Sequence, residues 1–168
     1  KTHTVEYLTG ESGATLELKD GDSDLITLGF AHTTSAKDFE GTLLLSDNIA
    51  HTVKVSTGTA AADYGKEQIL SGSLSTTGTD TLVKDGVGKL RLTGDSSSNY
   101  DNDLTVNHGT LIIGDGSDGG AALHSSTTVT LETGKLEIAA SENISNTIAG
   151  STTSSKKSMV GGKGTLST

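Results

Sequence analysis

A short phrase recurs along this chain: a glycine, one further residue, and then aliphatic residues with one residue between them. Gly88-Lys89-Leu90-Arg91-Leu92 is a clear copy. The copies are 16 to 31 residues apart, and periods in that range are typical of stacked supersecondary units rather than of one globular core. Clear copies begin at Gly41, Gly88, Gly109 and Gly134, and weaker ones at Gly13, Gly72 and Gly164.

Each copy predicts a corner followed by a strand. Glycine adopts positive φ without steric cost, so we expect Gly41, Gly88, Gly109 and Gly134 to be the repeat turns. The aliphatic residues that follow at period two point to one face of a strand. Residues 104–113 and 129–138 share the order strand, short step, glycine, strand, at a separation of 25 residues. That length is enough for one coil of a β-solenoid.

Composition favours a narrow, all-β interior. Aromatic residues are 3 % of the chain and tryptophan is absent, so the rings that usually dominate globular cores are missing. Stacked rows of Leu, Ile and Val, one layer per coil, need no large rings. Threonine, serine and glycine make up 70 of the 168 residues. We expect a single β domain over residues 1–168, with residues 1–80 less regular and residues 81–168 carrying the clearest solenoid repeats.

Alternation and turn residues predict the individual elements. The only plausible helix covers residues 59–70, and Gly65 near its middle weakens that interpretation. The predicted strands are Thr4 to Leu8, Ala14 to Leu18, Leu25 to Phe30, Thr42 to Leu45, Thr52 to Ser56, a strand at Leu82, Lys89 to Leu92, Leu104 to Val106, Thr110 to Ile113, Thr128 to Leu131, Lys135 to Ala139, and Met159 to Val160.

Charge and cysteine content argue against several classes of function. The net charge is −9 and Arg91 is the single arginine, whereas phosphate-dominated binding to nucleic acid needs clustered Lys and Arg. No apolar run approaches the roughly 18 to 20 residues that cross a bilayer. The chain has no cysteine, which leaves no disulfide, thiolate metal site or cysteine nucleophile.

Two motifs bear on cofactors. Asp20, Asp22 and Asp24 place three carboxylates at alternate positions, as the first ligands of a calcium loop do. Leu25 and Ala31 stand where that loop needs a glycine and a bidentate glutamate, so a solvated turn is the better interpretation and calcium the alternative. A G-x-G-x-x-G run at residues 114–119 lacks a following crossover helix, so we expect no dinucleotide cofactor.

No catalytic constellation is visible in the sequence. The five histidines lack metal-ligand spacing, and there is no G-x-S-x-G nucleophile elbow. Some parallel β-helices are polysaccharide lyases or hydrolases, which leaves a carbohydrate-acting enzyme as one alternative. Because Arg91 is flanked by Leu90 and Leu92, it is expected to be the outward residue of a strand. We therefore expect a protein that is not an enzyme.

Residues 82–114 resemble the autotransporter-associated β-strand repeat of passenger regions in Gram-negative surface proteins, with a weaker echo at residues 123–166. The resemblance implies an exported, right-handed β-solenoid at the cell surface or outside the cell, with no catalytic residues. Asp101-Asn102-Asp103 replaces the Gly-Gly that usually follows the tyrosine. The matching positions are Leu82, Lys84, Gly86, Gly88, Leu90, Leu92, Gly94, Asn99, Tyr100, Thr105, Val106, Asn107, Gly109, Thr110, Leu111 and Gly114.

Both ends of the chain are predicted to be strands that associate with other copies. A repeat stack without polar caps offers unpaired backbone groups and apolar rows to a neighbour. The leading hypothesis is a non-catalytic surface or extracellular subunit that self-assembles into a filament or sheath. The alternative is a passenger fragment acting as an adhesin toward a host or matrix polysaccharide or protein. The residues expected to self-associate are Thr4, Val5, Tyr7, Leu8, Gly164 and Leu166.

Overall fold

The structure is a computed structural model of the 168-residue chain. It describes residues 2–19, 25–29, 35–116, 121, 123–139, 143–150, 159–162 and 165–166.

Nearly all of the regular structure is parallel β-sheet. Within the described residues, sheet A has seven strands, sheet B has six and sheet C has three, and every strand pair is parallel. Sheet A contains, in spatial order, β1 (Thr2–Val5), β3 (Leu25–Leu28), β6 (Ala50–Val55), β9 (Thr81–Asp85), β11 (Leu104–Val106), β13 (Thr128–Leu131) and β16 (Thr147–Gly150).

The other sheets follow the same ascending order. Sheet B contains β4 (Lys37–Phe39), β7 (Glu67–Leu70), β10 (Lys89–Leu92), β12 (Thr110–Ile113), β14 (Lys135–Ile138) and β17 (Met159–Gly162). Sheet C contains β2 (Thr15–Leu18), β5 (Thr42–Leu45) and β8 (Leu74–Thr76). A two-stranded sheet of β15 (Asn143–Ile144) and β18 (Thr165–Leu166) takes the place of sheet C in the chain order of the last coils.

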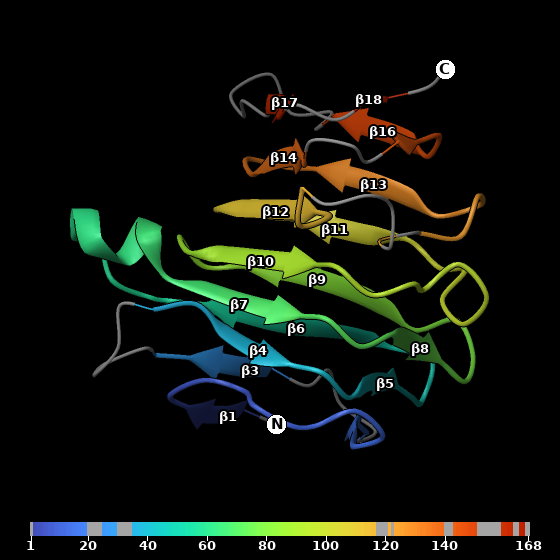
Figure 1. The fold of residues 1–168 in the computed structure, drawn as a ribbon, viewed down its shortest axis with the longest axis horizontal. Helices are drawn as coiled ribbons and strands as arrows, with labels where there is room; N and C mark the ends of the chain where they lie inside the picture. The colour runs from blue at the N-terminus through green and yellow to red at the C-terminus, as the bar shows by residue number, and fades with distance from the viewer. Residues whose placement is uncertain are drawn as a thin grey trace.

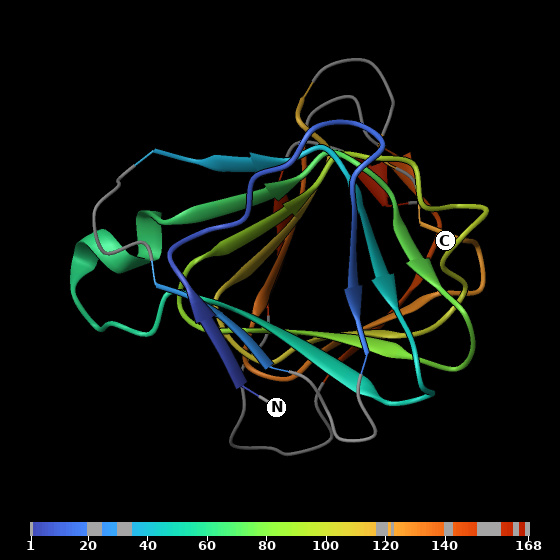
Figure 2. The ribbon, with the colours of Figure 1, turned by 90° about the horizontal axis from the view of Figure 1, so that it is seen from below.

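From β3 onward the chain passes from sheet A to sheet B and then along the third side, where sheet C lies in the lower coils, before it climbs one level, and this path makes a β-solenoid. Figure 1 shows the coils stacked from the N-terminus at the bottom to the C-terminus at the top, and Figure 2 shows their three-sided outline along the stack. The seven strands of sheet A correspond to seven coils. The all-β, parallel solenoid predicted from the sequence is confirmed, and strands within residues 1–80 pair in the same sheets as the later ones.

The uneven spacing of the glycine phrase has a structural cause. The copies at Gly13, Gly41 and Gly72 precede strands β2, β5 and β8 of sheet C. The copies at Gly88, Gly109 and Gly134 instead precede strands β10, β12 and β14 of sheet B. The phrase therefore marks two different corners of the solenoid, and the shortest interval separates a sheet C copy from a sheet B copy.

Aliphatic side chains stack in register through the interior. Leu90 is directly opposite Leu111, and Leu111 is opposite Leu136, each at 0 % exposure. A parallel column runs through Leu92, Ile113 and Ile138. Neighbouring strands are about 4.8 Å apart, so each inward side chain packs against the one above and the one below it.

Where sheet C is interrupted, Tyr100 fills the third side of the interior. Its ring is fully buried, and the hydroxyl accepts the Leu82 N–H at 2.9 Å while donating to the Asp103 carbonyl at 2.6 Å. Burial raises the pKa of the Tyr100 hydroxyl well above its ordinary value. The ring and two hydrogen bonds of Tyr100 thereby take the place of a sheet C strand at this level of the stack.

The repeat glycines are needed mainly for close approach between coils. Of the four predicted turns, only Gly109 has a positive φ, at 70°. At Gly41 an added Cβ would lie 2.5 Å from the Ala14 carbonyl oxygen of the coil below, and at Gly134 it would lie 2.3 Å from Val106 Cγ1. The expectation of positive φ at Gly41, Gly88 and Gly134 is therefore wrong. Glycine is needed at these positions because atoms of the coil below leave no room for a Cβ.

The predicted helix over residues 59–70 is mostly wrong. The structure has a short 3₁₀ helix, η1 (Ala61–Gly65), followed at once by strand β7. The Asp63 carboxylate accepts the Ala60 N–H at 2.9 Å and the Ser56 hydroxyl at 3.2 Å, which fixes this single turn. From Glu67 onward, strand pairing with β4 and β10 prevails over local helix propensity.

Truncation of one interior leucine tests the stacked columns. We expect Leu111→Ala to lower the free energy of unfolding by about 2–5 kcal/mol, because it leaves a cavity between Leu90 and Leu136. Thr105→Ala, on the outward side of β11, should change it by less than about 0.5 kcal/mol. Urea unfolding followed by circular dichroism measures both, and similar losses in the two variants would contradict the column.

Candidate functional site

The predicted self-association strand lies at the open edge of sheet A. All four residues of β1 are exposed, and the Val5 side chain is 41 % exposed. The Val5 carbonyl accepts the Gly29 N–H at 2.9 Å. Because the backbone groups of successive strand residues point to opposite edges, those of Thr4 point away from β3. Thr4 and Val5 thus offer a free backbone edge together with an apolar side chain.

Tyr7 and Leu8 are instead held by the chain's own later coils. The Leu8 N–H donates to Gln68 Oε1 at 2.9 Å, and Gln68 Nε2 donates back to the Leu8 carbonyl at 3.0 Å. The Lys37 ammonium lies 4.7 Å from the centre of the Tyr7 ring. The backbone N–H and carbonyl of Leu8 are therefore both bonded within the chain, so of the residues predicted in this segment only those in β1 lie at an open edge.

The remaining predicted residues are distributed as follows. Gly164 and the calcium candidates Asp20, Asp22 and Asp24 lie outside the described residues. Leu166 belongs to β18, where its backbone pairs with that of Ile144. Among the residues that the structure describes, no three His, Asp or Glu side chains are close enough to hold a metal ion.

A buried histidine–aspartate pair lies in the interior at the N-terminal ends of the neighbouring strands β6 and β9. His51 and Asp80 are both at 0 % exposure. His51 Nε2 lies 2.8 Å from the Ser46 carbonyl oxygen and 3.4 Å from Asp80 Oδ1, while no hydrogen-bond partner faces Nδ1 in the described residues. Burial alone raises the pKa of Asp80, but bonds from the Ile49 amide, the Thr76 hydroxyl and His51 outweigh it and lower the pKa.

Lys84 is an inward lysine at the corner between sheets A and B. Its side chain is fully buried, and its ammonium donates to the carbonyls of Asp85, Gly86 and His108 at 2.7, 2.8 and 3.0 Å. Gly109 packs on this cluster, since an added Cβ would lie 2.9 Å from Lys84 Nζ. Burial lowers the pKa of Lys84 to about 7, despite the carboxylate charge of Asp85.

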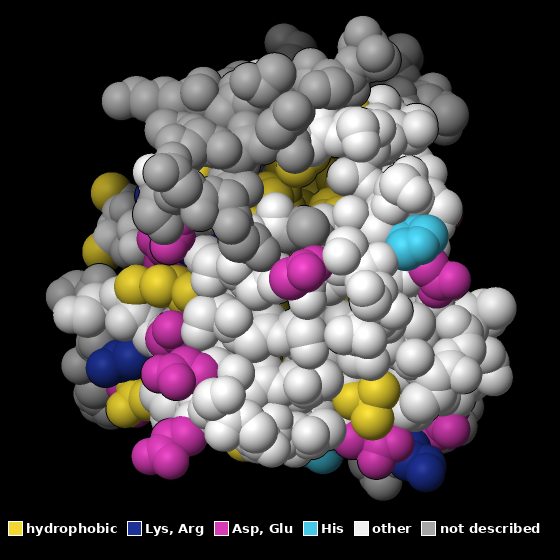
Figure 3. Space-filling model, turned by 45° about the vertical axis from the view of Figure 1, so that its right-hand side comes forward, with side chains coloured by type: hydrophobic (Ala, Val, Ile, Leu, Met, Phe, Trp, Pro, Cys, Tyr) yellow, Lys and Arg dark blue, Asp and Glu magenta, His cyan; other side chains and the backbone are white. Residues whose placement is uncertain are grey.

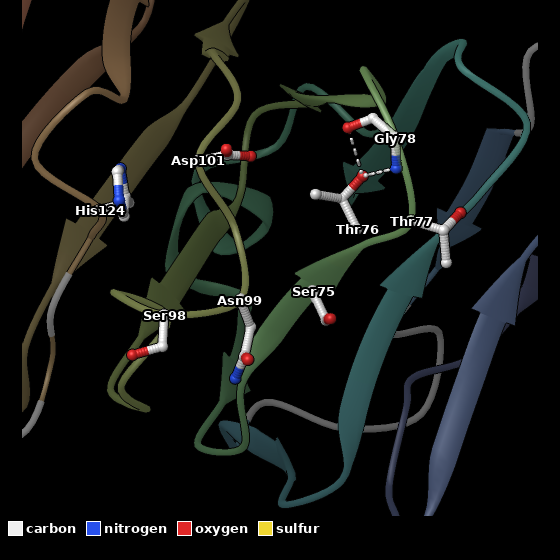
Figure 4. A pocket seen from close by; sticks show the side chains of 8 residues that line it. All are labelled: Ser75, Thr76, Thr77, Gly78, Ser98, Asn99, Asp101 and His124. Carbon is white, nitrogen blue, oxygen red and sulfur yellow. Dashed lines mark hydrogen bonds between the residues drawn. The ribbon is translucent and has the colours of Figure 1, made fainter.

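A polar pocket lies beside β8, where sheet C stops. Its volume is about 430 Å³. The edge of β8 is closed by the next coil, since the Leu74 N–H donates to Ser96 Oγ at 2.9 Å and the Thr76 N–H donates to the Asn99 carbonyl at 3.0 Å. The side chains that line the pocket, shown in Figure 4, are those of Ser75, Thr76, Thr77, Ser98, Asn99, Asp101 and His124, together with Gly78.

The chemistry of this pocket is hydrogen bonding. Hydroxyl, amide and carboxylate groups line it. On the face of the molecule drawn in Figure 3, uncharged polar side chains and backbone, in white, predominate. His124 Nδ1 lies 2.7 Å from Ser126 Oγ and accepts the Ser126 N–H at 3.2 Å, as in a local turn. Such a lining suits a neutral polar ligand such as a sugar.

The sequence interpretation missed Gln68, the His51–Asp80 pair and the burial of Lys84. Each of Gln68, His51 and Lys84 occupies an inward strand position where alternation predicts an aliphatic side chain. Gln68 precedes the inward Leu70 by two residues, and Lys84 follows the inward Leu82 by two. The signal in the sequence was a polar residue at a position where the alternation places an apolar side chain.

Comparison of the chain with protein-family models, with curated proteins and with solved structures finds no match in any of the three. In the part of the chain that the structure describes, no helix has the length and apolar character needed to cross a membrane.

The lowered pKa of Lys84 predicts how stability depends on pH. The ordinary pKa of 10.5 applies to the unfolded chain, whereas the folded value is about 7. Between these values the unfolded chain binds a proton that the folded chain does not, so stability rises with pH. The free energy of unfolding, relative to that of Lys84→Met, should increase between pH 7.5 and 9.5, with a slope approaching about 1.4 kcal/mol per pH unit.

Urea titrations at each pH measure this difference. Lys54→Met is the matched control, because Lys54 is an outward lysine of sheet A and is paired with Asp85 at 3.3 Å. It should keep the wild-type pH dependence. A parallel pH profile for the wild type and Lys84→Met would show that Lys84 is charged in the folded protein throughout this range.

Proposed function

We propose that this protein is a non-catalytic structural subunit of the bacterial cell surface or extracellular space. Its coil stacks associate end to end through open strand edges and so build a filament or sheath. The observation that carries this proposal is the position of the exposed aliphatic side chains. Among the described residues, the large hydrophobic side chains that are exposed are Val5 in β1, Val160 in β17, and Tyr64 in η1.

Both ends of the stack offer the groups that strand addition requires. Within the described strands, β1 pairs only with β3, β16 only with β13, and β17 only with β14. An unpaired edge is a template for another strand, and main-chain hydrogen bonds supply the affinity. A contact between two different edges does not close on itself, so its repetition gives an open polymer.

Partway up the stack, sheet C ends at β8, which would leave an unpaired strand edge on the side of the solenoid. At the upper edge of β8, Ser96 and Asn99 take up the free N–H groups. The edge that remains available at β1 lies at the end of the stack. Growth along the axis is therefore favoured over lateral pairing.

The placement at the cell surface rests on the resemblance of residues 82–114 to the autotransporter-associated repeat. In the fold this segment contains β9, β10, β11 and β12, so one repeat accounts for one coil and the start of the next. The chain has no cysteine, so an oxidising compartment would form no disulfide in it before it folds.

A passenger fragment acting as an adhesin is the second candidate. The polar pocket beside β8 favours it, since its hydroxyl and amide groups suit recognition of a sugar. In this case the stack is a stalk, and the ligand binds to the side of the stack.

Proline at the open edge tests strand addition. We expect the wild-type chain to form filaments as its concentration is raised. The Thr4→Pro variant should need a concentration about tenfold higher to form them. The proline removes an N–H that points away from β3, so it leaves the ladder between β1 and β3 intact. Negative-stain electron microscopy and sedimentation velocity at several concentrations measure assembly.

Thr105→Lys is the control, because it places a charge on the outward side of a middle coil without touching either end. It should assemble like the wild type. A wild-type chain that stays monomeric at every concentration, or a Thr4→Pro variant that assembles normally, would overturn end-to-end strand addition and favour the adhesin.

A further inference from the structure

A second hollow lies on the corner between sheets A and B, beside η1. Its volume is about 460 Å³, and its walls come from coils three to six of the stack. η1 supplies Tyr64, and the corners above it supply Lys89, Thr110 and Lys135. Because successive coils contribute one after another, the hollow is a groove that runs parallel to the axis of the stack. We call it the corner groove.

The floor of the corner groove is backbone. Gly109 and Gly134 line it, and neither position has room for a side chain over the coil below. The same steric constraint that keeps these corners as glycine therefore keeps the groove open. The Thr133 hydroxyl, which also lines the groove, donates to the Asn107 carbonyl.

Two lysines border the groove at a fixed separation. In the strand register Lys89 is opposite Thr110, and Thr110 is opposite Lys135, so all three lie in one outward column. Two strand spacings place the two lysine Cα atoms about 10 Å apart. Lys135 bonds Glu137, whereas Lys89 has no ion pair within the described residues. Glu67, below Lys89 in the column, is instead paired with Arg91.

The groove also presents an aromatic ring. Tyr64 is 54 % exposed, the largest value among the exposed large hydrophobic side chains of the described residues. η1, which carries Tyr64, projects from the left of the solenoid in Figures 1 and 2. An exposed tyrosine offers an apolar face and a polar hydroxyl to a ligand that has both characters.

We propose that the corner groove binds a linear anionic polysaccharide rich in uronate residues, with the polymer lying along the axis of the stack. A sugar ring packs on Tyr64, one carboxylate pairs with Lys89, and a second pairs with Lys135 in place of Glu137. The separation of the two lysines is comparable to a disaccharide repeat. Charge complementarity selects an anion locally although the whole chain is at −9. Nucleic acid fits this groove less well, because its phosphates are much more closely spaced than the two lysines. This binding does not depend on assembly into filaments.

Titration of the full chain with polygalacturonate tests the proposal. We expect saturable binding that weakens with salt, and no binding to neutral dextran. Lys89→Gln and Tyr64→Ala should each weaken binding about tenfold, whereas Tyr64→Phe should retain it. Isothermal titration calorimetry measures the affinities, and circular dichroism checks that each variant is folded.

Lys19→Gln is the matched control, because it removes the same charge from an exposed lysine next to β2 on sheet C. It should change the affinity by less than about twofold. An equal loss with Lys19→Gln, the absence of polygalacturonate binding, or tighter binding to single-stranded DNA would each overturn the proposal. Normal filaments without polygalacturonate binding would refute the groove alone and leave the proposed assembly intact.

Discussion

The in-register parallel ladder is the constraint on which the rest of this structure depends. Each inward side chain has one neighbour directly above and one directly below, as in the column Leu90, Leu111 and Leu136. A side chain of the wrong size or polarity therefore disturbs the packing of both neighbouring coils. The ladder also fixes the corners, because glycine is needed where one backbone lies directly over another, as at Gly41 over Ala14.

Polar residues inside the columns are tolerated only where they supply their own partners. Gln68 is opposite Leu90 in the column and bonds the backbone of Leu8 and Lys37 below it. Lys84 lies between Val53 and Val106 and reaches three carbonyls at the corner. Both side chains thereby add hydrogen bonds between coils to those of the strand ladders, Gln68 to the coils below it and Lys84 to His108 of the coil above.

The part of the fold that sequence reasoning could predict is the part with strict alternation. The bounds of β10, β11, β12 and β13 agree with the predicted strands, because leucine, isoleucine and valine occupy every inward position there. The short strand β4, where Phe39 is the one fully buried residue, was not predicted. β7 was assigned to a helix, because Gln68 interrupts the apolar pattern and only pairing with β10 reveals it as a strand.

The candidate sites were less accessible to sequence reasoning for a related reason. Thr4 and Val5 were predicted at an edge from local strand character, which one segment suffices to show. The corner groove brings together residues from η1, β10, β12 and β14, and their proximity depends on the register between coils.

The two proposed functions both rest on that register. The direction of coil stacking exposes backbone edges at the ends, and the outward columns place like residues at regular intervals along the sides. End-to-end addition would extend the corner groove in the same direction as the filament. A polymer bound along the axis would then contact successive subunits, so assembly would raise the effective affinity of a weak individual groove by multivalency.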